Sequence, residues 1–362
     1  MKNTLGSSIT LTLFGESHGE YIGAVLDGLA PGMEINDEYI KECLAKRRPG
    51  GKISTARVEA DEYSIVSGAV NGYTTGTPLC ILIPNTNKKS ADYSALADTP
   101  RPSHADLTAH YKYHGFEDKR GGGHFSGRLT APIVAAGAII KYALMKKGIR
   151  IGTHISELHG VRDRAFEDYK SDIDALDAKL FPTLSDDAAE LMRAQIEAAA
   201  ADGDSVGGIL ETVILGMPCG VGEPWFDTLE SVLAHAIFSI PAIKGVEFGL
   251  GFGFASARAS EANDAIVTDG KEITTATNNS GGICGGISNG MPIVMRAVVK
   301  PTPSLSKEQM SVSLSKMENT TLSVVGRHDP AIIHRARAVV DAMAAITLAD
   351  MLAVRFGTDY LA

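Results

Sequence analysis

The chain has 362 residues, of which 44% are hydrophobic and 21% charged, and its formal net charge is −9. This length is enough for one large domain or two ordinary ones with an ample core. The composition is typical of a soluble globular protein. The negative balance argues against nucleic acid as a partner, because nucleic-acid binding needs a basic face. The four cysteines show no metal or redox spacing, which indicates reduced core thiols in a cytoplasmic protein.

The first half of the chain predicts two helices on either side of a β-rich stretch. Asn36 begins the first helix as its cap, and Pro49 ends it after Lys46–Arg48. One interpretation of Arg47 and Arg48 is therefore that they complement the helix dipole. Strands are expected at 63–70 and 78–83. An apolar helix runs from Arg128 to about Lys147, and its uncharged core is too short to span a bilayer. No export signal is visible at the N-terminus.

The second half alternates irregularly between strands and helices, without internal repeats or a linker. Strands are expected at 149–155, 209–215, 246–254 and 292–299, and helices at 186–201 and 227–238, the latter with an Asp227–Glu230 capping box. A glycine-rich loop spans 278–290. Asp329 is the expected cap of a last helix that has Pro330 at its first position and ends near Phe356. The pattern predicts a single α+β domain covering residues 1–362.

Four cationic or titratable blocks recur in short, glycine-punctuated sequence across most of the chain. They are Gly15–Gly19, Arg101–Asp106, Asp118–Arg128 and Gly326–Pro330. If they converge, they make a pocket rich in positive charge and histidine, which suits an anionic small molecule. No dinucleotide fingerprint or nucleotide-phosphate loop accompanies them. His104 and His110 do not share a helical face and no cysteine joins them, so a metal site is not expected.

Each block also has an ordinary structural interpretation. A loop histidine such as His18 is more often incidental than catalytic, and Arg57 or Arg128 could be a surface arginine. Against this, His104, His110, His114 and His124 lie within 21 residues that also hold several lysines and arginines. Such clustering favours anion chemistry near neutral pH, where histidine exchanges protons.

Taken together and in order, ten motifs across essentially the whole chain closely resemble those of chorismate synthases. They are Phe14–Gly19, Arg47–Gly50, Thr75–Pro78, Asn85–Asn87, Arg101–Asp106, Gly121–Gly123, Lys244–Gly249, Gly281–Ser288, Lys300–Ser304 and Arg327–Pro330. The resemblance implies a β-α-β sandwich with mixed, mostly antiparallel sheets packed around central helices, usually assembled as a homotetramer. It also implies anti-1,4-elimination of phosphate from 5-enolpyruvylshikimate 3-phosphate to give chorismate, with reduced FMN that is not consumed.

Residue roles follow from the same resemblance. His18 is similar to the acid beside the leaving phosphate, and His104 to the histidine that protonates the reduced flavin. Asp329, paired with Ser17, resembles a dyad that assists proton removal through flavin N5. The substrate-binding arginines implied are Arg48, Arg57, Arg101 and Arg128. The cofactor-binding residues implied are His124, Phe125, Ser126, Pro241, Ala242, Gly285, Lys300, Pro301, Thr302, Pro303, Ser304 and Arg327.

The chain departs from the family pattern at a few positions. His124 stands where an arginine is common after the triple glycine, and Pro241 replaces an asparagine, removing an amide and a backbone donor. An arginine found near Ser54 in several versions is missing. With no added reductase domain evident, a separate flavin reductase is expected, and NAD(P)H enters only as an external reductant.

Three other functions stay open from the sequence. A flavin carrier that binds FMN without turnover would keep the glycine loops but would not need His18, His104 and Asp329 together. A sugar-phosphate kinase or lyase unrelated to flavin lacks support from any nucleotide motif. A purely structural oligomer is the third alternative.

Overall fold

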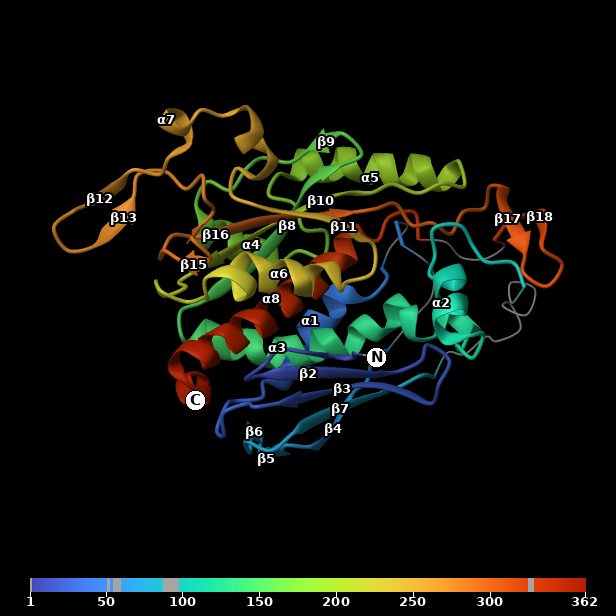
Figure 1. The fold of residues 1–362 in the computed structure, drawn as a ribbon, viewed down its shortest axis with the longest axis horizontal. Helices are drawn as coiled ribbons and strands as arrows, with labels where there is room; N and C mark the ends of the chain where they lie inside the picture. The colour runs from blue at the N-terminus through green and yellow to red at the C-terminus, as the bar shows by residue number, and fades with distance from the viewer. Residues whose placement is uncertain (1, 51–52, 55–59, 87–97, 325–328) are drawn as a thin grey trace.

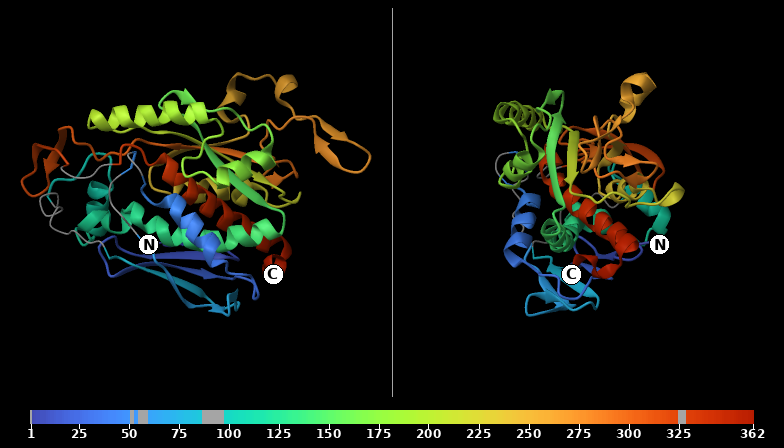
Figure 2. Two further views of the ribbon diagram at one scale, coloured as in Figure 1. Left: turned by 180° about the vertical axis from the view of Figure 1, so that it is seen from behind. Right: turned by 90° about the vertical axis from the view of Figure 1, so that its left-hand side faces the viewer.

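A computed structural model describes residues 2–50, 53–54, 60–86, 98–324 and 329–362. Within these ranges two five-stranded sheets enclose a layer of helices, as Figure 1 shows. The same layering is visible from behind and from the side in Figure 2. The α+β class and the sandwich of antiparallel sheets around central helices, predicted from the sequence, are confirmed.

The first sheet is antiparallel throughout and has the order β1-β2-β3-β7-β4. One face packs on the helices, which explains the alternation along its strands: Leu79, Ile81 and Ile83 are buried and their neighbours are less so. The loop between β2 and β3 carries the Gly15–Gly19 motif to one end of this sheet. The strands are β1 (Thr4–Leu5), β2 (Thr10–Gly15), β3 (Tyr21–Asp27), β4 (Ser64–Ser67) and β7 (Leu79–Pro84).

The second sheet, also antiparallel, has the order β11-β16-β10-β8-β9. Thr153 and Thr212 are paired neighbours on its inner face, and Thr153 donates a hydrogen bond to Asp341 of the last helix. The strands are β8 (Arg150–Leu158), β9 (Val161–Arg162), β10 (Gly208–Leu215), β11 (Ile243–Phe248) and β16 (Ile293–Val299).

The central layer contains α1 (Asp37–Arg47), α3 (Thr130–Lys146) and α8 (Ile333–Phe356). Small residues let these helices approach closely. A Cβ built on Gly137 of α3 would lie 2.4 Å from the Cβ of Ala342 in α8, so only glycine fits there. The segment Gly127–Lys146 is long and apolar enough to cross a membrane, yet 83% of its most apolar window is buried. It is the core helix of this fold.

The remaining elements surround these layers. Two hairpins, β12–β13 and β17–β18, project from opposite ends of the molecule (Figure 1). The peripheral helices are α2 (Asp106–Tyr113), α4 (Tyr169–Asp177), α5 (Asp186–Ala201), α6 (Leu229–Phe238) and α7 (Ala259–Ala262). The short strands are β5 (Ala69–Val70), β6 (Tyr73–Thr74), β12 (Ile266–Thr268), β13 (Ile273–Thr275), β14 (Ile283–Cys284), β15 (Ile287–Ser288), β17 (Gln309–Ser313) and β18 (Glu318–Leu322).

Three sequence predictions of local structure were wrong. The strand expected at 246–254 ends at Phe248, because Gly249 and Gly251 adopt positive φ and the Glu247 carboxylate accepts the Phe252 N–H in a tight turn. The strand expected at 63–70 is interrupted at Gly68, whose φ is +81°. The cap of α6 is Thr228, whose hydroxyl accepts the Ser231 N–H, rather than Asp227.

The cysteines also differ in part from expectation. All four are free, and Cys43 is buried between the central helices, but Cys219 and Cys284 are exposed. They lie at the β14–β15 hairpin, which buries Ile283 and Ser288 but leaves both thiol-bearing residues on its outer side. The expectation of core thiols was therefore wrong for these two.

Candidate active site

Ser17 and His18 occupy the loop between β2 and β3 and are buried, with 2% and 5% exposure. The Ser17 N–H donates to the Gly123 carbonyl at 3.0 Å, and the Gly19 N–H closes the loop on Glu16 at 3.0 Å. The Ser17 hydroxyl makes no hydrogen bond with another described residue. A buried hydroxyl without a partner is costly in a folded protein, and such atoms are often placed for a ligand.

The triple glycine Gly121–Gly123 forms the wall against which His18 lies. All three residues have positive φ, at 62°, 83° and 53°, which favours glycine. A Cβ on Gly121 would lie 2.1 Å from His18 Nδ1 and 2.9 Å from the Ser17 hydroxyl, so any side chain there would displace both. The following His124 pairs through Nδ1 with the Gly15 carbonyl at 2.8 Å, which fixes the other end of the same loop.

Three arginines converge on the carboxylate of Asp61, whose side chain is fully buried. Arg47 bonds it at 2.9 Å, the Arg48 Nε lies 3.6 Å away, and Arg128 forms a third, short ion pair. Burial alone would raise the pKa of Asp61, but the charges of Arg47 and Arg128 outweigh burial and hold it below the usual range. Three cations share one anion here, so the cluster has an excess of positive charge.

The buried position of Arg47 corrects the interpretation of its role. Arg47 is 3% exposed and bonds Asp61, so it is not a solvated charge at the end of α1. Its backbone carbonyl also accepts a hydrogen bond from Arg335 of α8 at 2.8 Å. Helix composition alone pointed to dipole complementation, because the partner carboxylate lies beyond the helix.

A second group of predicted residues forms around Arg101 and His104. Arg101 makes a bidentate pair with Asp106 at 2.8 and 2.9 Å, and His104 Nε2 lies 2.8 Å from the Ser304 hydroxyl. Lys300 donates to the Ser103 carbonyl at 2.6 Å. Burial, the charge of Arg101 and that of Lys300 together lower the pKa of His104 to about 4, although Asp106 opposes them. His104 is therefore a neutral imidazole at neutral pH when no ligand is present.

These two groups belong to one site. A Cβ built on Gly122 would lie 3.9 Å from an Arg101 Nη atom and 3.8 Å from the Ser126 Cβ, so the triple glycine contacts both. Ala242, with φ of +76°, accepts the Lys300 N–H at 2.9 Å and joins the Pro241–Ala242 turn to the Lys300–Ser304 segment. The predicted residues that the structure groups in this way are Ser17, His18, Arg48, Arg101, His104, His124, Ser126, Arg128, Pro241, Ala242, Lys300 and Ser304.

Other predicted residues lie apart or differ from expectation. Gly285 lies between β14 and β15, where a Cβ built on it would meet nothing within 4 Å, and the next residue, Gly286, lies against Thr228 at the start of α6. Phe125 is exposed and meets the edge of Tyr113. Arg57 and Arg327 lie outside the described residues. Their roles, and that of Gly285, stay predictions.

Asp329 is not the cap of the last helix, which corrects that prediction. The cap position is Ile332 and α8 begins at Ile333, because the chain bends at Pro330 and stays irregular for two more residues before the helix. The Asp329 carboxylate forms an ion pair with Arg335. No hydrogen bond between Asp329 and Ser17 occurs in the part of the chain that the structure describes, so the proposed pair is not formed in this state.

Sequence reasoning missed Asp61 and Asn85, although both organise the site. Asp61 lies in a β-rich stretch with no distinguishing pattern, and its importance comes from contacts with arginines up to 67 positions away. Asn85 was part of a motif without an assigned role. Asp118 was noted within its charged run, and its pKa is lowered by Arg120, with a smaller contribution from His18.

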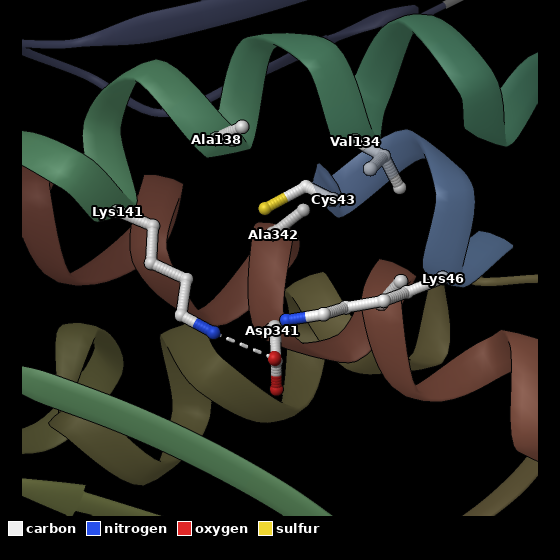
Figure 3. Close-up of a pocket in the computed structure, with 9 residues that line it drawn as sticks. Cys43, Lys46, Val134, Ala138, Lys141, Asp341 and Ala342 are labelled. Atoms are coloured by element: carbon white, nitrogen blue, oxygen red, sulfur yellow. Dashed lines mark hydrogen bonds and ion pairs between the residues drawn. The ribbon is translucent and has the colours of Figure 1, made fainter. Parts of the chain in front are cut away.

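A small cavity lies elsewhere, between α1, α3 and α8 (Figure 3). It offers about 10 Å³, room for about one water molecule. Lys141 and Asp341 line it and bond each other at 2.7 Å. It is too small for a substrate and does not include the histidines of the candidate site. Among the described residues, no group of three or more His, Cys, Asp and Glu side chains is arranged to hold a metal.

Comparison with known proteins gives a consistent result. The family model for chorismate synthase matches residues 9–353. The chain is 47% identical over 360 residues to a chorismate synthase of Dehalococcoides mccartyi, covering 99% of this chain and 98% of that protein. It is 46% identical to one from Thermococcus gammatolerans, with 96% of each covered. A crystal structure of chorismate synthase superimposes with a TM-score of 0.77 at 30% identity, covering 98% of this chain and 94% of that one.

Proposed function

This chain belongs to the chorismate synthase family, and from that premise we propose the reaction that its site performs. The substrate is 5-enolpyruvylshikimate 3-phosphate, and the product, chorismate, forms by anti-1,4-elimination of phosphate with reduced FMN and no net redox change. The single observation that carries the proposal is the grouping of His18, the triple glycine and the arginines of two distant segments around one buried, cation-rich site.

The charge of the site suits this substrate, which has one phosphate and two carboxylates. Arg48 and Arg128 share Asp61, and Arg101 is oriented by Asp106, so guanidinium groups held in fixed positions supply the positive charge that attracts these anions. Fixed cations in a site shielded from water stabilise negative charge as it develops on departing phosphate. This electrostatic stabilisation is the main contribution that we assign to the protein.

Two histidines are placed for proton transfer. His18 lies in van der Waals reach of Gly121 and is held in a buried loop, where it would donate a proton to the leaving phosphate oxygen. The low pKa of His104 arises largely from burial and neighbouring cations, so an anion bound beside it would raise that pKa and let it hold a proton. We keep Ser17 and Asp329 as the residues proposed to assist removal of the substrate hydrogen.

The residues expected around FMN fit an anionic flavin. The hydroxyl of Thr302, in the Lys300–Ser304 segment, is buried and has no hydrogen-bond partner among the described residues. Lys300 and the glycine backbone at Gly122, where a Cβ would meet nothing closer than 3.8 Å, add a cation and an open surface. When bound, reduced FMN supplies an electron-rich ring that assists the elimination without being consumed. His124, Ser126, Ala242, Lys300 and Ser304 are the grouped residues proposed to hold it.

The wider setting follows as part of the same proposal. We propose a cytoplasmic enzyme that acts on a small molecule, with a separate flavin reductase and NAD(P)H as the indirect source of reductant. We propose a homotetramer as the resemblance implies, and apolar side chains left exposed at the surface offer it contact area between copies. Ile266 and Ile273 of the β12–β13 hairpin are 78% and 75% exposed, and Phe252 is 83% exposed.

One experiment separates the candidate functions. The protein is mixed with substrate and dithionite-reduced FMN in oxygen-free buffer, and release of phosphate and chorismate is followed. We expect both products with reduced FMN, and none with oxidised FMN without a reductant. Flavin binding without product would favour a flavin carrier. Phosphate release at the same rate with reduced and oxidised FMN would favour a lyase unrelated to flavin. Either result would overturn the proposed reaction.

A further inference from the structure

We infer that Asn85 is a positioning residue, which fixes the loop of Ser17 and His18 and the guanidinium of Arg128 relative to each other. The inference rests on the proposed function, since it assigns catalytic and substrate-binding roles to His18 and Arg128. Asn85 directly follows β7 and is 9% exposed. The Asn85–Asn87 motif marked this residue, but the sequence assigned it no role.

The side-chain amide of Asn85 uses all of its hydrogen-bonding groups in two directions. Nδ2 donates to the carbonyls of Glu16 and Gly19 at 3.0 and 3.1 Å, one on each side of the Ser17–His18 pair. Oδ1 accepts from Arg128 Nε at 3.2 Å. The backbone N–H adds a fourth bond, to the Glu20 carbonyl at 3.0 Å. Asn85 thus holds the loop of Ser17 and His18 through its Nδ2 group and contacts Arg128 through its Oδ1 atom.

The chemistry of the neighbours fixes the orientation of this amide. The loop presents carbonyl oxygens, which need a donor, and Arg128 presents an N–H, which needs an acceptor. A reversed amide would set donor against donor and acceptor against acceptor. A leucine at position 85 would have a similar shape but make none of the three side-chain hydrogen bonds. An aspartate there would keep the acceptor for Arg128 and lose both N–H donors to the loop carbonyls.

Arg128 is held on two edges as a result. Its Nε edge faces Asn85 and one Nη group faces Asp61, while a second Nη lies 3.4 Å from the Pro84 carbonyl. Asn85 therefore sets both the position of His18, the proposed proton donor, and the orientation of the Arg128 guanidinium plane. Both are proposed to act on one leaving phosphate, so their relative placement matters, and a misplacement of about 1 Å can cost about 100-fold in rate.

The test compares Asn85→Leu and Asn85→Asp with a matched control, Asn36→Ala. Asn36 caps α1 at the end away from Arg47 by accepting the Tyr39 N–H at 3.0 Å, and its loss is expected to cost about 1 kcal/mol of stability without touching the site. We expect kcat per folded protein to fall about 10–100-fold in both Asn85 variants. KM should rise about 3-fold in Asn85→Leu and about 10-fold in Asn85→Asp, because the added carboxylate beside Arg128 competes with substrate phosphate.

Hydrogen exchange supplies a readout that does not depend on turnover. The amides of Ser17 and His18 should exchange faster in both Asn85 variants than in the wild type, and at the wild-type rate in Asn36→Ala. Kinetic constants in both Asn85 variants that match Asn36→Ala, or unchanged exchange at Ser17 and His18, would overturn the inference. If the wild-type protein itself shows no turnover, the proposed function fails, and the exchange measurement still decides the role of Asn85.

Discussion

Two histidines in this molecule have pKa values shifted in opposite directions, and the reason lies in the charges around them. His104 lies among Arg101 and Lys300 with Asp106 as the opposing carboxylate, and burial with these cations lowers its pKa to about 4. His154, on the second sheet, is also buried, which alone would lower its pKa, but hydrogen bonds with Asp163 and Glu211 outweigh burial and raise it. Burial is common to both, so the neighbours decide the sign.

The charges around these histidines distinguish a binding site from a part of the molecule that only stabilises the fold. Around His154, three carboxylates and Arg296 form a closed row across β8, β10, β16 and β11, in which Arg296 pairs with Glu211 and Glu247 at 3.1 and 2.6 Å. Around His18 and His104, arginines outnumber carboxylates, and three of them share Asp61. A network with charges satisfied internally stabilises the fold, whereas an excess of cations favours binding of an external anion.

The largest effect should appear when histidines of the two regions are replaced. His18→Ala and His104→Ala should each lower kcat by about 10²–10⁴-fold, the usual range for a positioned acid or base. His154→Ala should leave kcat per folded protein unchanged. Steady-state kinetics on purified folded variants provide the measurement. Near wild-type kcat in either site variant would mean that this histidine is an incidental loop residue.

The next largest effect concerns Asp61. Asp61→Ala removes the carboxylate shared by three arginines and should lower the free energy of unfolding by about 3–5 kcal/mol, because Arg47 and Arg128 are then buried without it. Inorganic phosphate should restore part of the loss, since an anion can occupy the vacated position. Urea unfolding with and without phosphate tests this. Equal phosphate effects on Asp61→Ala and on Glu211→Gln would contradict it.

Stability should depend on pH with opposite slopes from the two histidines. The lowered pKa of His104 means that the unfolded chain binds a proton first, so stability is lost as pH falls from about 6.5 towards about 4, by about 3 kcal/mol. The raised pKa of His154 contributes stability that is complete below about pH 6.5 and is lost as pH rises through its folded value. His104→Gln should reduce the acid-side loss, while buried His334, whose pKa is also lowered, keeps part of it. His154→Gln should reduce the loss of stability at higher pH. Unfolding curves across pH 4–9 whose slopes in both variants equal those of the wild type would refute the assignment.

The smallest effect is expected at His124. The residue lies beside the histidine loop, and His124→Arg would place a permanent charge where a titratable one stands. Affinity for FMN or substrate should then change less with pH between the acid and neutral ranges, while catalysis continues. Affinity measured against pH for both proteins gives the answer. Superimposable curves would show that the His124 side chain has only a packing role.

Much of the fold could be predicted from the sequence, because helices such as Thr130–Lys146 and strands such as Ile293–Val299 have strong local signals. The failures were positions at which a distant or following residue decided the backbone. The Glu247 carboxylate accepts the Phe252 N–H and stabilises the turn that ends the strand. The helix α8 begins only at Ile333, although Asp329-Pro330 is a typical helix start. Local patterns contain no information about such contacts.

The candidate site also contains residues that the sequence identified and others whose role only the structure shows. Motifs identified His18, Arg101, His104 and Arg128, and the structure groups them. Asp61 could not be found, because it acts through arginines on other elements. Asn85 lay in a motif, but its role could not be found, because it acts through backbone carbonyls 66 and 69 positions away. Their importance depends on tertiary contacts rather than on residue type or spacing.

The central claim is that the candidate site has an excess of cations that favours anions, and the pKa of His104 tests it most directly. The pKa is measured by NMR titration of the histidine ring, first without ligand and then with saturating inorganic phosphate. We expect a value of about 4 without ligand and a clear rise with phosphate, because a bound anion offsets Arg101 and Lys300. A value near 6.5 that phosphate does not change would contradict the claim.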